Sequence, residues 1–156
     1  MDRYFMQQAL LEAKKALDIG EVPIGAVVVR NGEIIGRGFN QRESLCDPTA
    51  HAELVAIRDA ARNLGTWRLT GTQLYVTLEP CPMCAGAIVN SRLDELVFGA
   101  SDPKAGAVTS LMNIVQDKRL NHNVQVIAGI CEEESRKLLQ VFFQAMRVRA
   151  KSNKER

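Results

Sequence analysis

The sequence has no long apolar run, few cysteines and almost no excess of charge. No apolar stretch among its 156 residues approaches the roughly 20 that cross a bilayer, and its first residues lack the apolar core of a secretory signal. Of its four cysteines, two share one short motif and the other two lie far apart, so a disulfide framework is not indicated. The sequence therefore predicts a soluble protein of the cytoplasm with no membrane partner.

Internal repeats, low-complexity tracts and linkers are also absent. Apolar residues make up 46% of the chain and charged residues 24%, which is the ordinary balance of a globular protein. A chain of this length buries about two-thirds of its unfolded surface when it folds as one unit. We expect a single domain over residues 1–156.

The net charge of +2 is weak evidence for a nucleic-acid partner, but the basic residues are unevenly spread. The tail at about 147–156 carries a single acidic residue, Glu155, and five basic residues: Arg147, Arg149, Lys151, Lys154 and Arg156. Two interpretations stay open. The cations can favour the negative end of a helix dipole, or they can contact phosphates.

Apolar periodicity and turn residues predict an alternation of helices and strands. Asn31-Gly32 is a strong signal for a hairpin between two strands. The expected helices cover about 5–17, 49–64, 81–90 and 132 onward, and the expected strands cover 24–29, 33–39, 74–78, 95–100 and 124–127. The fold class predicted is α/β, a three-layer α/β/α sandwich around a mixed sheet of about five strands. Trp67 and the Phe142–Phe143 pair are interpreted as packing residues rather than base-stacking ones.

The strongest signal for chemistry is a histidine and two cysteines in two short motifs. His51 and Glu53 lie in Pro-Thr-Ala-His-Ala-Glu, and Cys81 and Cys84 lie in Pro-Cys-Pro-Met-Cys. One imidazole and two thiolates suit a tetrahedral Zn²⁺ and leave its fourth position open, where it acidifies a bound water to a pKa of about 7. Glu53 is close enough to move that water's proton without being a ligand. The pattern is typical of zinc-dependent base deaminases.

Other interpretations of these residues are possible. A Cys-x-x-Cys pair also occurs in redox proteins and in structural zinc sites, and Cys46 or Cys131 could close a Cys₃His site. A structural site has no need of Glu53, however, and the prolines that flank Cys81 suit the entrance of a helix. We expect one catalytic zinc ion per chain, bound by His51, Cys81 and Cys84.

Both ligand sets are expected at helix starts. If Thr49 caps the second helix, His51 and Glu53 fall in its first turn. Cys81 and Cys84 are three residues apart and face the same side of the next helix. The partial positive charge at the N-terminus of that helix favours thiolates.

Over nearly its whole length, from Tyr4 to about Arg149, the chain resembles the bacterial tRNA adenosine deaminases. The matching segments are Gly-Glu-Val-Pro-Ile-Gly-Ala (20–26), Asp-Pro-Thr-Ala-His-Ala-Glu (47–53), Leu-Tyr-Val-Thr-Leu-Glu-Pro-Cys-Pro-Met-Cys-Ala-Gly-Ala (74–87), Phe-Gly-Ala-Ser-Asp-Pro-Lys-Ala-Gly (98–106), Ser-Leu-Met-Asn (110–113) and Asn121-His122. The two zinc motifs are shared with guanine and cytidine deaminases, whereas the segments from residue 98 onward are more specific.

This resemblance implies a cytidine-deaminase-like fold, a homodimer, and hydrolytic conversion of adenosine to inosine at the wobble position (34) of a tRNA anticodon. By position in the family, the target nucleoside is contacted by Asn40 and Asn121, and the anticodon stem-loop lies near Asp102 and Lys104. Without the resemblance, Asn40 and Asn121 are ordinary turn and loop residues. Cys46 is a departure, because the family does not normally carry a cysteine in that loop.

Two rival functions remain. One is deamination of free guanine or of cytidine as a base or nucleoside. The other is a zinc-stabilised RNA-binding module in which Glu53 has no chemical role.

Overall fold

A five-stranded mixed sheet forms the middle of the molecule in the computed structural model, which describes residues 1–155. The strands are β1 (Gly25–Arg30), β2 (Glu33–Phe39), β3 (Thr72–Leu78), β4 (Glu95–Ala100) and β5 (Gln125–Ala128). Their order across the sheet is β2-β1-β3-β4-β5. The β1–β2 and β1–β3 pairs are antiparallel, whereas β3, β4 and β5 run parallel.

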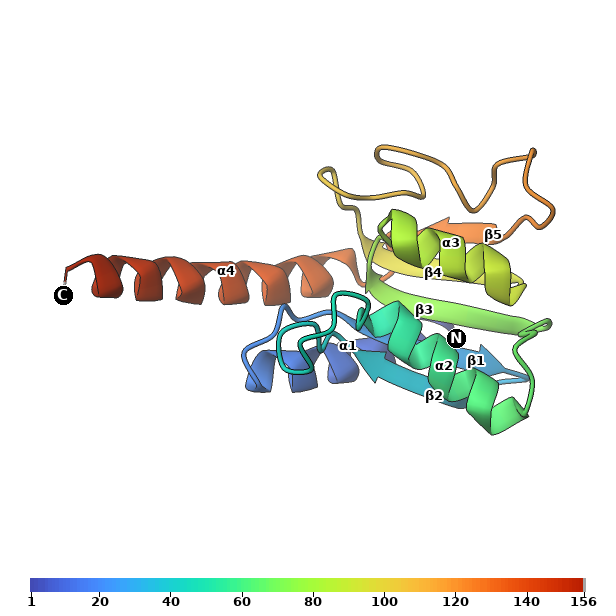
Figure 1. Cartoon of the computed structure of the whole chain (residues 1–156), viewed down its shortest axis with the longest axis horizontal. Helices are drawn as coiled ribbons and strands as arrows, with labels where there is room; N and C mark the ends of the chain where they lie inside the picture. The colour runs from blue at the N-terminus through green and yellow to red at the C-terminus, as the bar shows by residue number, and fades with distance from the viewer. Residues whose placement is uncertain (156) are drawn as a thin grey trace.

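Helices cover both faces of this sheet (Figure 1). They are α1 (Asp2–Asp18), α2 (Ala52–Leu64), α3 (Pro82–Ser91) and α4 (Glu132–Lys154). The helices α2 and α3 share one apolar core with the sheet, and α1 and the start of α4 share the other. The predicted three-layer α/β/α sandwich is therefore confirmed.

Alternation along the strands explains why the sheet has two apolar faces. In β1, Ala26 and Val28 face the core under α2 and α3, whereas Val27 and Val29 face the core under α1. All four side chains are nearly fully buried. A strand that is buried on both faces needs a continuous apolar run, and residues 26–29 provide one.

The hairpin between β1 and β2 has the geometry that its sequence predicts. Asn31 and Gly32 have φ angles of 51° and 77°, and Arg30 pairs with Glu33 across them. Two successive positive φ angles are those of a type I′ turn, for which Asn-Gly is the preferred pair.

Glycines in β2 let α2 pack unusually close to the sheet. An ideal Cβ at Gly38 would lie 2.5 Å from the carbonyl oxygen of Ala52, and one at Gly36 would lie 2.5 Å from that of Ala56. The side of α2 that meets them carries alanines: Ala52, Ala56 and Ala60. This close packing fixes the position of the α2 N-terminus, where His51 and Glu53 lie.

We expect Gly38→Ala to destabilise the protein, because the added methyl forces α2 away from β2. Overpacking of this kind costs about 1–3 kcal/mol of unfolding free energy. Gly86→Ala in α3 is the matched control, because nothing lies within 4 Å of its added Cβ. It should instead be neutral or stabilise by up to about 1 kcal/mol, since alanine is the better helix former. Urea unfolding of both variants measures the difference, and equal stability would contradict the close approach.

Several predicted boundaries shift in the structure. The helix α2 begins at Ala52 with His51 as its N-cap residue, so the prediction that Thr49 caps it is wrong. Thr49 instead donates its backbone N–H and its hydroxyl to Asp47, at 2.8 and 2.7 Å. The strand β3 begins at Thr72, two residues before the predicted start, and β5 ends one residue later than predicted.

Aromatic residues show a second difference. The prediction that Trp67 packs inside is wrong, because its side chain is 60% exposed and lies under the Arg68 guanidinium, 4.9 Å from the ring centroid. The pair on α4 is split: Phe142 is buried, whereas Phe143 is 45% exposed.

The C-terminal half of α4 extends away from the rest of the molecule (Figure 1). Its residues from Phe143 onward are exposed, and Arg147, Arg149, Lys151 and Lys154 belong to this segment. Arg156 lies outside the described residues. No helix within residues 1–155 is long and apolar enough to cross a membrane.

Candidate metal centre

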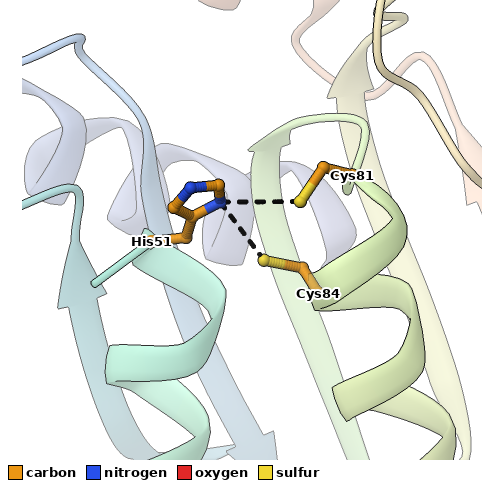
Figure 2. A group of neighbouring side chains, drawn as sticks. All are labelled: His51, Cys81 and Cys84. Atoms are coloured by element: carbon orange, nitrogen blue, oxygen red, sulfur yellow. Dashed lines mark hydrogen bonds between the residues drawn. The ribbon is translucent and has the colours of Figure 1, made fainter. Parts of the chain in front are cut away.

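The starts of α2 and α3 bring three ligand-type side chains together. His51 is the N-cap residue of α2 and Cys81 that of α3, whereas Cys84 lies in the first turn of α3. Figure 2 shows the His51 ring directed at both sulfur atoms across the gap between the two helices. Its Nδ1 lies 3.6 Å from the Cys81 Sγ and 3.5 Å from the Cys84 Sγ.

These separations fit a zinc ion. Zinc bonds of about 2.3 Å to sulfur and about 2.0 Å to nitrogen, at tetrahedral angles, hold nitrogen and sulfur about 3.5 Å apart. The ligand-type atoms of His51, Cys81 and Cys84 all lie within 4.8 Å of one another. Within the described part of the chain this is the one group of three or more His, Cys, Asp or Glu residues arranged to hold a metal. Three protein ligands would leave one position of a tetrahedral zinc ion open for a substrate or a water.

Ionisation of one of the two thiols also favours a cation. A hydrogen bond from Cys84 lowers the pKa of the Cys81 thiol to about 4, and the neighbouring His51 adds to this effect. The same hydrogen bond and burial raise the pKa of Cys84. The thiolate on Cys81 in turn raises the pKa of His51. A divalent cation held here would displace the remaining thiol proton, because a coordinating thiol is deprotonated.

Glu53 lies in the first turn of α2, beside this group, and its side chain is only 4% exposed. Burial raises its pKa to about 7, and the Cys81 thiolate adds to that rise. A carboxyl with a pKa near neutrality can both accept and release a proton under ordinary conditions.

The remaining cysteines and the second histidine lie outside this group. Cys46 is exposed and has its own loop partner, the Glu43 carbonyl at 3.7 Å. Cys131 is buried at the start of α4. The His122 Nε2 pairs with the carbonyl oxygen of Leu93 at 2.7 Å. None of the three joins the ligand group, so a closed Cys₃His site is not supported by the structure.

A cleft of about 440 Å³ opens over His51. Its size is that of a small-ligand pocket. The residues that line it are Val22, Ile24, Asn40, Arg42, His51, Ala52, Leu78, Ser101, Asp102, Pro103, Lys104, Leu139 and Phe143. Apolar walls with a few polar groups at the rim suit a planar heterocycle attached to a charged chain.

Three of the four predicted substrate contacts line this cleft. The Asn40 side chain donates to the Val22 carbonyl and accepts from the Arg42 N–H, so its orientation is fixed. Asp102 accepts two N–H groups of its own turn through Oδ1, and exposed Lys104 lies two residues further on. Asn121 is exposed in the loop before β5 and does not line the cleft of its own chain. Its role stays a prediction.

Sequence analysis missed four residues that shape this cleft. Arg42, Leu139 and Phe143 line it, and the two from α4 come from a distant part of the chain. The fourth, Glu79, holds one of its loops. Burial alone would raise the pKa of Glu79, but hydrogen bonds from Ser110, Thr109 and Asp102 lower it to about 2. Its place between β3 and Cys81 was the one available signal.

Comparison with known proteins finds deaminases. A family model described as MafB19-like deaminase matches residues 1–147. The chain is 54% identical over 151 residues to the "tRNA-specific adenosine deaminase" of Bacillus subtilis, covering 97% of this chain and 94% of that protein.

Two solved structures are also similar. One comes from a study of A-to-I editing by tRNA:A34 deaminases at the wobble position of transfer RNA; it has a TM-score of 0.84 and 48% identity, over 87% of this chain and 99% of that chain. The other is a guanine deaminase from Bacillus subtilis, with a TM-score of 0.60 and 41% identity over 63% of each chain. The fold is thus shared by enzymes that act on different bases.

Proposed function

Because the chain belongs to the MafB19-like deaminases, and within them to the tRNA-specific adenosine deaminases, we propose that His51, Cys81 and Cys84 hold the zinc of its active site. The enzyme hydrolytically deaminates adenosine to inosine at the wobble position (34) of a tRNA anticodon. The observation that carries the proposal is the ligand group itself, together with a cleft that reaches its His51.

Bound zinc supplies a Lewis acid that lowers the pKa of water to about 7. The other steps are made by the chain's own residues. Glu53 accepts a proton from the attacking water and delivers it to the adenine ring at N1, which makes C6 open to addition. Glu53 then takes the second proton from the hydroxyl group now bonded to C6 and delivers it to the amino group, so that the C6–N bond breaks, ammonia leaves and C6=O forms. A single carboxylate serves both transfers.

The cleft is suited to a substrate nucleotide in a single-stranded loop. The bases of an anticodon loop can be turned outward at small cost, because they are unpaired. Asn40 at the wall and Asp102 and Lys104 at the rim offer polar contacts to the base and its neighbours. We propose that these contacts, rather than the zinc group, distinguish tRNA from free nucleosides.

Guanine deamination is the second candidate, favoured by the similar guanine deaminase structure. Turnover of guanine, cytidine, adenosine and tRNA, followed by their absorbance changes, separates the two. We expect tRNA to be the preferred substrate and free adenosine to be poor, because it lacks the flanking nucleotides whose binding orients the base. Faster turnover of guanine or cytidine than of any tRNA would contradict the proposal. Binding of tRNA without loss of its adenosine would favour a non-catalytic RNA-binding module.

Homodimer formation and a cytoplasmic location also belong to the proposal. The homodimer is expected from the family resemblance and the cytoplasmic location from the cysteine usage, and the exposed apolar side chains Leu111 and Met112 are compatible with a covered surface. Sedimentation of the purified protein tests the dimer.

Replacement of the exposed cations of α4 should reduce the salt dependence of tRNA binding. Each neutralised phosphate contributes about −0.7 to the slope of log K against log[salt] for single strands. Replacing Arg147, Arg149 and Lys151 with alanine should flatten that slope by about one to two units and leave the zinc content unchanged. An unchanged slope would mean that these residues form only a solvated helix end.

A further inference from the structure

Glu79 is a buried carboxylate with many hydrogen-bond donors around it. It follows the last residue of β3 and precedes Pro80 and Cys81, and it is 2% exposed. All of its side-chain partners lie in one loop, residues 101–110, which we name the rim loop. This loop is 23 to 31 residues away in sequence.

The carboxylate of Glu79 accepts five hydrogen bonds from the rim loop. Its Oε1 accepts the Asp102 N–H at 3.0 Å and the Ser110 hydroxyl. Its Oε2 accepts three consecutive backbone N–H groups, those of Val108 (3.1 Å), Thr109 (2.8 Å) and Ser110 (2.9 Å). Five donors converge on two oxygen atoms, which together offer about four lone-pair sites.

The rim loop is also shaped to admit this carboxylate. An ideal Cβ at Gly106 would lie 2.5 Å from both carboxylate oxygens of Glu79, so only glycine fits there. The next residue, Ala107, donates its N–H to the Pro80 carbonyl at 2.8 Å. Two consecutive residues, Glu79 and Pro80, thus fix a loop that has no regular secondary structure of its own.

Both segments that these hydrogen bonds join, residues 79–81 and the rim loop, contribute residues to the proposed active site. Cys81, one of the three proposed zinc ligands, lies two residues after Glu79. At the other end, the rim loop contributes Ser101, Asp102, Pro103 and Lys104 to the cleft. The carboxylate of Glu79 therefore links the segment that carries Cys81 to the loop that forms one wall of the cleft.

We propose that Glu79 is a positioning residue, which fixes the rim loop relative to Cys81 so that Asp102 and Lys104 meet the bound nucleotide. This role rests on the proposed function. Glu79 does not line the cleft and takes no part in the proton transfers. Its effect is on substrate binding, because the rim-loop contacts lie away from the atoms that react.

Glu79→Gln tests this role. The substitution keeps the shape of the side chain but replaces one acceptor oxygen with an amide donor, which then faces N–H groups. Loss of a hydrogen bond to a charged group corresponds to roughly tenfold or more in binding. KM for tRNA should rise at least about tenfold, kcat should change less than about threefold, and the zinc content should stay at one per chain.

Glu12→Gln is the matched control. Glu12 is equally buried, at 2% exposure, and pairs with Lys15 and Arg37 on the opposite side of the sheet. Its variant should keep wild-type KM and kcat. Ser110→Ala, which removes one of the five donors, should raise KM in the same direction but by less.

Hydrogen exchange gives a readout that does not depend on catalysis. The N–H groups of Val108, Thr109 and Ser110 should be protected in the wild-type protein and exchange at least about tenfold faster in Glu79→Gln. If no tRNA is deaminated at all, the proposed function fails, and exchange still decides whether Glu79 holds the loop. The positioning role is overturned if these amides are unprotected in the wild type. It is also overturned if Glu79→Gln loses zinc or kcat while KM is unchanged.

Discussion

Glu53→Gln is expected to reduce turnover by at least the roughly 10²–10⁴-fold that general acid–base catalysis supplies. The loss should lie at the upper end or beyond, because the same carboxylate makes two proton transfers. Fold and zinc content should be retained, since the substitution removes no ligand of the metal group and hardly changes the side-chain volume. Single-turnover rates on tRNA and metal analysis of the same preparation measure both quantities.

The fall in rate should appear in kcat, because the proton transfers occur only as the reaction proceeds. The Glu12→Gln variant is again the control for removing a buried carboxylate, since Glu12 lies on α1 and its partners, Lys15 and Arg37, lie outside the cleft. Wild-type rates in a folded, zinc-loaded Glu53→Gln protein would mean that this carboxylate has no chemical role.

Cys84→Ser should lower zinc affinity by more than the 10–100-fold that is usual for loss of an outer partner of a metal ligand. Cys84 is fully buried, and its Sγ lies 3.5 Å from the His51 Nδ1, so no water can replace the thiolate without rearrangement. Activity should fall to background. The melting temperature should also fall, because metal binding contributes to folding where the ligands come from two elements.

Cys46→Ser is the matched control for that change. Cys46 is exposed, and its sulfur has only a loop carbonyl as partner. The variant should bind one zinc per chain and keep near-normal activity. Loss of zinc from it, with zinc retained by Cys84→Ser, would assign the metal to a different ligand set.

Each half of the His51–Cys81–Cys84 group could be predicted from the sequence, because the residues of each half are neighbours along the chain. Cys81 and Cys84 are neighbours on one face of α3 by helical spacing alone, and His51 and Glu53 belong to one short segment. The sheet and its two covering layers were also predictable, since the strand at residues 26–29 is continuously apolar and the turn at Asn31-Gly32 has a strong preference.

Features that depend on distant partners could not be predicted. Thr49 is a good N-cap residue, but Asp47 competes for its N–H and hydroxyl, so His51 takes the cap position. Glu79 looks like any glutamate at a strand end until a loop more than twenty residues away encloses it. Nothing in the local sequence indicates that Phe143 of α4 lines the same cleft as His51.

The central claim is that this chain makes inosine at the wobble position of a tRNA anticodon. The most direct measurement is mass analysis of nuclease fragments of tRNA after incubation with the zinc-loaded protein and, in parallel, with Glu53→Gln. The wild-type protein should raise the mass of the anticodon fragment by about 1 Da at position 34, since a ring C–NH₂ becomes C=O with release of ammonia, and Glu53→Gln should leave it unchanged. The account would be contradicted if the folded and zinc-loaded wild-type protein left adenosine unmodified at position 34 of every tRNA that carries it.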